Sequence, residues 1–148
     1  MRSRAASSVL VLTVATACHA AAPREPTPVA PPTTAQLGPT GIRRTLVNRR
    51  PTADHAGWET CMYLIEFAPG ATAPPHVHPA IGVGLVLDGR FESAFGDDPV
   101  VEIQAGQAFV DQAVTTHRVF RNPSPDRVLR FVVAYTLRAG EAPLSPVP

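Results

Sequence analysis

His76, Val77 and His78, followed much later by His117, are the residues whose types and spacing are best suited to chemistry. On a β-strand successive side chains alternate between faces, so His76 and His78 point one way and Val77 the other. Their Cα atoms are then roughly 6.5–7 Å apart, and two imidazoles can converge on one ion at about 2.0–2.2 Å from each nitrogen. His117 lies in a second segment of alternating apolar residues. The pattern therefore predicts a metal site shared by two strands; the alternative is a chance pair of surface histidines.

These segments carry a family resemblance. Residues 69–79 and 84–89 resemble the first sequence motif of the cupin superfamily, and residues 106–109 and 117–122 resemble the second. The resemblance spans roughly residues 58–137. It implies an all-β fold, a cupin-type jelly-roll β-barrel that holds one metal through two His and usually a Glu of the first motif and one His of the second. The ligands implied in this chain are His76, His78 and His117.

The usual Glu is missing, because its position, seven residues before Gly89, holds Gly82. Three histidines plus water remain a known metal arrangement with an open position. The chain resembles a three-histidine subset of cupins that includes dioxygenases cleaving β-dicarbonyl compounds with non-haem iron. That subset has an acidic residue six before the second-motif His, here Asp111, and a Pro-Pro-Gly stretch that residues 112–114 replace. Three further residues match the subset: Arg118, Arg121 and Asn122.

Asp111 ends an apolar segment, an unusual place for a carboxylate without a partner. It could approach the open metal position, orient a ligating imidazole, or act as the catalytic base on bound substrate. The structural alternative is a strand-end Asp that bonds to the local backbone in a turn.

The first 22 residues have the features of a secretory signal, with arginines, a short apolar core and small residues before Cys18. Cys18 after Ala17 resembles a bacterial lipobox, in which the cysteine is lipidated. Ordinary cleavage after Ala17 or Ala22 is the alternative. Residues 23–39 are rich in Pro, Thr and Ala, which predicts an extended linker.

Residues 40–138 have the size of one domain. Apolar alternation and turn residues predict strands at 45–49, 60–67, 82–87, 91–95, 100–103, 108–111, 117–121 and 128–137. Asp88 and Gly89 are expected to form a hairpin turn. No segment has a helical period, and residues 139–148 are expected to be a loose tail.

All 13 basic residues are Arg, which excludes Schiff-base and phosphate-loop lysine chemistry. The net charge of +1 gives little support for nucleic-acid binding. The pairs Arg43-Arg44 and Arg49-Arg50 are expected on a solvated face. Cys61 is expected to be buried and unpaired, and His55 to be exposed.

These observations predict an exported cupin that binds one divalent metal, with Fe2+ favoured and Zn2+, Mn2+, Ni2+ or Cu2+ as alternatives. The leading function is a metal-dependent oxygenase acting on a small molecule, and the alternative is a non-catalytic binding module. The membrane is a partner only through the lipid anchor, and a homodimer is allowed. The expected location is the bacterial cell envelope, as a lipoprotein, or otherwise the periplasm or the medium.

Overall fold

The computed structural model describes residues 40–147, which form strands and no helix. The strands are β1 (Ile42–Pro51), β2 (Trp58–Phe67), β3 (His76–Val77), β4 (Gly82–Asp88), β5 (Arg90–Phe95), β6 (Val101–Gln104), β7 (Ala108–Asp111), β8 (His117–Arg121), β9 (Leu129–Arg138) and β10 (Ser145–Pro146). Within this part of the chain there is no helix long and apolar enough to cross a membrane.

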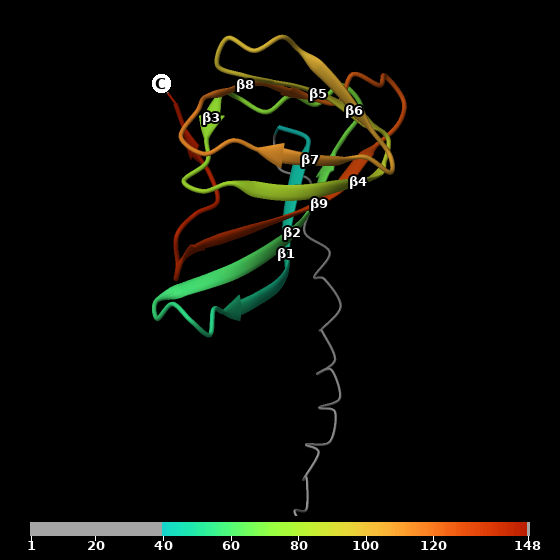
Figure 1. Cartoon of the computed structure of the whole chain (residues 1–148). Coiled ribbons are helices and arrows are strands. Elements are labelled where there is room, and N and C mark those ends of the chain that lie inside the picture. Colours follow the sequence, from blue (N-terminus) through green and yellow to red (C-terminus); the bar gives the residue numbers. More distant parts are fainter. Residues whose placement is uncertain (1–39, 148) are drawn as a thin grey trace, which may run out of the picture.

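The strands form two antiparallel five-stranded sheets, in the orders β1-β2-β9-β4-β7 and β10-β3-β8-β5-β6 (Figure 1). Few strand neighbours in a sheet are neighbours in sequence, so the chain crosses repeatedly between the two sheets. This topology is the predicted all-β jelly roll. We call the first sheet the β9 sheet and the second the β8 sheet.

The hydrophobic core lies between the inner faces of the two sheets. Along β9 every second residue is buried, and these residues are Leu129, Phe131, Val133, Tyr135 and Leu137. The core is rich in aromatic side chains that meet edge to face, as Phe91 does with both Phe109 and Phe120. Burying one such ring contributes about 1.5–3 kcal/mol. The aromatic packing holds the two sheets, and thus the histidines and Asp111, in one arrangement.

All eight predicted strands are present, but three expectations differ from the structure. Gly89, at φ 78°, turns the chain from β4 into β5, yet these strands belong to different sheets and form no hairpin. Turn residues specify a local reversal, not whether the flanking strands pair. The strand expected through both histidines is shorter than that: β3 covers only His76 and Val77, and His78 lies just beyond its end. The third difference is the tail.

The tail is not loose: Ser145 and Pro146 pair with β3 as β10, and the Val147 amide donates to the Pro75 carbonyl over 3.2 Å. Figure 1 shows the C-terminal end beside β3. Proline richness made this segment look unstructured, but two residues at a sheet edge need little backbone hydrogen bonding. The signal segment, Cys18 and the linker lie outside the described residues.

Candidate metal centre

The three predicted histidines meet in the interior. His76 pairs directly with His117 across β3 and β8, and His78 follows the end of β3. All three are buried, with at most 3% of their surface exposed. One nitrogen of each lies within 4.8 Å of one nitrogen of the others. Three nitrogen donors at this mutual distance surround a space that suits one metal ion.

Each imidazole is anchored through its other nitrogen. The Nδ1 atoms of His76 and His78 donate to the carbonyls of Pro74 and Pro143, over 2.8 and 2.9 Å. A carbonyl only accepts, so both Nδ1 atoms carry the proton and both Nε2 atoms present a lone pair. His117 contacts the Ser93 hydroxyl through Nε2 at 2.8 Å. Such bonds orient ligating histidines and set their tautomers.

Two of the ring nitrogens that face the centre of the site make no hydrogen bond within the described residues. His78 Nε2 and His117 Nδ1 are buried and have no hydrogen-bond partner within residues 40–147. A buried polar atom without a partner costs about 1–3 kcal/mol, which a metal ion would recover. The residues present therefore fit a bound divalent metal.

Burial also keeps the three imidazoles neutral. It lowers the pKa of His76 and His78, and it lowers the pKa of His117 to about 3, where the other two histidines add to the effect. Metal binding requires unprotonated imidazole. The site is thus in the correct protonation state over the whole neutral range.

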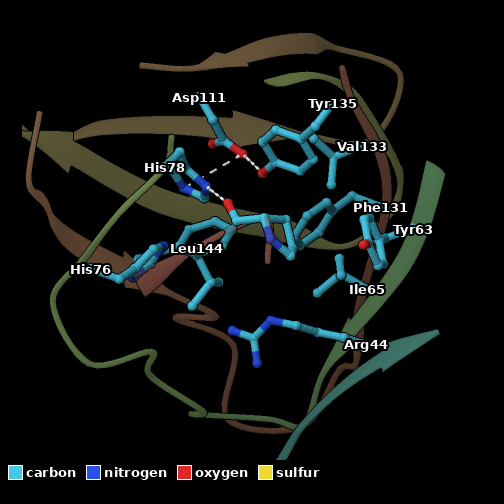
Figure 2. A pocket seen from close by; sticks show the side chains of 12 residues that line it. Arg44, Tyr63, Ile65, His76, His78, Asp111, Phe131, Val133, Tyr135 and Leu144 are labelled. Atoms are coloured by element: carbon cyan, nitrogen blue, oxygen red, sulfur yellow. Dashed lines mark hydrogen bonds and ion pairs between the residues drawn. The ribbon is translucent and has the colours of Figure 1, made fainter. Parts of the chain in front are cut away.

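Asp111 belongs to the opposite sheet and faces the histidines (Figure 2). Its Oδ2 atom lies 3.8 Å from His78 Nε2 and accepts a hydrogen bond from the Tyr135 hydroxyl. Burial raises the pKa of Asp111 to about 6, against the opposing effects of Tyr135 and His76. The alternative of a strand-end Asp in local turn bonds does not fit a carboxylate that is 4% exposed and bonded to a distant strand.

Gly82 makes the bond between Asp111 and Tyr135 feasible. In register, Gly82 lies opposite Asp111 on β7 and opposite Tyr135 on β9, so the three form one row on the inner face. A Cβ atom at Gly82 would stand 2.3 Å from the Tyr135 ring. The Tyr135 ring therefore occupies the space that the Cβ atom of a Glu at this position would need.

Tyr135 is a site residue that the sequence did not indicate. Its position in the buried alternation of β9 was visible, but an aromatic residue there suggests only core packing. The relevant signal, its register with Gly82, depends on strand pairing.

In the loop before His117, one residue has a backbone conformation that favours glycine. Val114 adopts φ 54°, in the left-handed region, and it occupies the position of the glycine in the subset's Pro-Pro-Gly stretch. Its amide donates to the His78 carbonyl over 2.9 Å. The loop thus holds the backbone of a candidate ligand although its residues differ from the subset.

A pocket opens beside the histidines, with a cavity volume of about 30 Å³. Figure 2 shows it from close by; its lining residues are Arg44, Tyr63, Ile65, His76, His78, Asp111, Phe120, Phe131, Val133, Tyr135, Pro143 and Leu144. Because a water molecule needs about 10–15 Å³ of such volume, the cavity has room for about two. Leu144, from the segment expected to be a loose tail, restricts its size.

Two further predictions, for Cys61 and His55, are confirmed. Cys61 is buried and unpaired, and His55 is exposed and lies outside the site. The arginine pairs are solvated as expected at Arg49 and Arg50, and Arg44 is exposed too, but its side chain also lines the pocket. Strand alternation could have suggested this, because Arg43 and Arg44, as neighbours on one strand, point to opposite faces of the sheet.

Comparisons with known proteins agree with this fold. The family model described as Cupin domain matches residues 63–135. No curated protein is similar enough in sequence to count as a relative. The protein is therefore a small cupin, and the jelly roll and the two motifs belong to that superfamily.

Several solved structures share the fold. The polyketide cyclase RemF from Streptomyces resistomycificus has 22% identity and a TM-score of 0.55, over 73% of this chain and 72% of that one. KdgF from Halomonas sp. has 25% identity and a TM-score of 0.55, over 71% and 88%. An oxalate oxidase in complex with the substrate analogue glycolate has 20% identity and a TM-score of 0.57, over 78% and 66%. Their different activities mean that the fold alone does not decide the reaction.

Proposed function

We propose that this cupin is a metal-dependent enzyme of the oxygenase type that acts on a small organic substrate. The observation that carries the proposal is the buried Asp111 carboxylate, 3.8 Å from the unpartnered Nε2 of His78 and facing the same pocket. A binding site for metal alone needs no such group. Iron(II) is the proposed metal, with Zn2+, Mn2+, Ni2+ and Cu2+ as alternatives, since imidazole ligands suit several of them.

A bound divalent metal would supply Lewis-acid or redox chemistry at the three histidines. The role of this chain's own residues centres on proton transfer. Tyr135 donates to Oδ2 of Asp111, which leaves Oδ1 without a hydrogen bond among the described residues. Oδ1 is then the atom that takes a proton from the substrate. Its raised pKa of about 6 lies near neutral pH, where a general base works best.

A specific observation supports the alternative of a non-catalytic binding module. The cavity of about 30 Å³ is closed on one side by Pro143 and Leu144 and has no room for an organic substrate unless this segment moves. In that case the domain would retain a metal or a very small ligand.

Oxygen uptake separates the two functions. The iron-loaded protein should consume oxygen with at least one member of a panel of β-dicarbonyl compounds, and the His76→Ala protein should not. If the wild-type protein contains about one iron per chain and yet gives a flat oxygen trace across the panel, the binding module becomes the better description.

We propose further that the domain is exported and attached to the bacterial cell envelope through lipidated Cys18. The support is the sequence alone. Cys18→Ser should convert a membrane-associated protein into a soluble or unprocessed one. A soluble wild-type protein whose mature chain starts at Pro23 would favour ordinary secretion instead.

A further inference from the structure

Two adjacent arginines on β1 face opposite sides of the β9 sheet. Arg43 lies opposite Glu66 in register and forms an ion pair with it. Arg44 lies opposite Ile65, which lines the pocket. Residues directly opposite each other in an antiparallel pair share a face. Arg44 therefore belongs to the inner face, and Figure 2 shows its side chain extending from β1 into the pocket.

Arg44 differs from most other arginines in having no protein partner. Within residues 40–147 it forms no ion pair and no hydrogen bond, whereas six arginines have a carboxylate within ion-pair distance: Arg43, Arg49, Arg90, Arg121, Arg127 and Arg130. Arg44 is an exposed residue, and the protein packed around its guanidinium nevertheless lowers its pKa by desolvation. A partly desolvated cation without an anion is stabilised when a ligand supplies one.

The charge balance of the pocket also favours an anion. The three imidazoles are neutral, and Gly82 replaces the carboxylate that other cupins add. Asp111 is the only carboxylate in the lining, and it is engaged with Tyr135. A divalent cation together with Arg44 then outweighs that one negative charge. In a partly dehydrated pocket such an excess attracts an anionic ligand strongly.

The remaining walls are apolar. Ile65, Phe131 and Val133 lie between Arg44 and the Asp111–Tyr135 pair along the inner face. A ligand that fits this surface has a charged end and a short hydrocarbon part. Such a ligand is larger than the cavity of about 30 Å³, so Leu144, which lines it, has to move.

We infer that Arg44 binds the carboxylate of a small organic acid whose other oxygen-bearing end faces the three histidines. This names the substrate class of the proposed enzyme, and its metal end rests on that proposed function. A guanidinium suits this role because its planar fork can donate two parallel hydrogen bonds to a carboxylate.

Acetoacetate and pentane-2,4-dione form a matched pair of probes, because they differ mainly in carrying a carboxylate or an uncharged acetyl group. The zinc-loaded protein allows binding to be measured by calorimetry without turnover. We expect acetoacetate to bind more tightly than the dione. Arg44→Gln should weaken acetoacetate binding by about 10- to 100-fold and leave binding of the dione unchanged. Arg44→Lys should restore part of the affinity.

Arg43→Gln is the control, since it removes the same charge from the other face of the same strand. Equal Kd values of wild type and Arg44→Gln for acetoacetate would overturn the inference, as would an equal loss in Arg43→Gln. Zinc content is measured first for each protein. If zinc is absent but acetoacetate binding still depends on Arg44, the anion site stands and the metal site fails. If zinc binds and acetoacetate does not, only the Arg44 inference fails.

Discussion

The two sheets contribute different chemistry to the same pocket. The β8 sheet supplies uncharged nitrogen donors, His76 and His117, with His78 just beyond β3. The β9 sheet supplies the charged and hydroxyl-bearing residues, Asp111 and Tyr135 with Arg44. In this arrangement one wall can hold a metal while the opposite wall binds and deprotonates a substrate. Substitutions on the two walls should therefore have separable effects.

Removing a histidine should have the largest effect. His76→Ala or His117→Ala should largely abolish binding of about one zinc per chain, because two imidazoles rarely hold the ion without a third ligand. Metal analysis after zinc loading measures this. His55→Ala, which changes an exposed histidine outside the site, should keep full zinc content. Zinc retained by the double substitution of His76 and His78 would contradict the proposed ligand set.

Asp111→Asn should separate metal binding from turnover most clearly. The three imidazoles remain, so metal content should be unchanged, whereas turnover should fall by about 10²–10⁴-fold because the amide cannot accept the substrate proton. Metal analysis and oxygen uptake on the same sample test both statements. A parallel loss of metal would instead show that Asp111 is a metal ligand. It would contradict the claim that the β8 sheet alone supplies the metal ligands.

The C-terminal segment holds His78 and β3 in place. A chain that stops after Ala142 loses the Pro143 carbonyl that holds His78 Nδ1, and it loses β10. Removing such a supporting bond typically costs about 10–100-fold in metal affinity, and we expect a loss of that size. A chain that stops after Pro146 keeps both features and should bind zinc normally. Competition with a chromophoric chelator measures the two affinities, and equal values would contradict this role of the tail.

Substitutions at Gly82 test the packing of Tyr135 beside Asp111. Gly82→Glu would place the family's carboxylate at this position as a possible fourth ligand. Its Cβ, however, would stand 2.3 Å from the Tyr135 ring and collide with it. Gly82→Ala should already lower the free energy of unfolding by about 1–3 kcal/mol through overpacking. Gly82→Ala combined with Tyr135→Ala should lose less than the sum of the single changes. Denaturant unfolding measures this, and strict additivity would show that Gly82 and Tyr135 do not compete for space.

The last expected effect is that of pH on the stability of the metal-free protein. The folded state keeps His117 neutral down to about pH 3, whereas the unfolded chain takes up this proton near pH 6.5. Stability should therefore fall as the pH drops below 6.5, by up to about 1.4 kcal/mol per pH unit for each such histidine. Asp111 acts in the opposite direction between its ordinary pKa of 3.8 and its folded pKa of about 6, because the folded state then holds the extra proton.

The histidines outnumber Asp111, so the net slope should follow them. Urea unfolding at pH 7.5 and 5.5 should give a lower free energy at 5.5, and His117→Gln should flatten the difference. An unchanged difference in that variant would mean that other groups cause the pH dependence.

The sequence by itself determined the strands and the histidine set, because strand alternation and turn residues act between near neighbours. His76 and His78 share a face for that reason. Only the tertiary structure decided what surrounds them. Tyr135 meets Asp111 across 24 residues and Pro143 meets His78 across 65, and both contacts depend on strand register and on the docking of the tail. Local patterns carry no information about such registers, since these are selected by the packing of the whole core. The sequence shows Gly82 as a missing ligand, but the space that Gly82 leaves for Tyr135 depends on the pairing of β4 with β7 and β9.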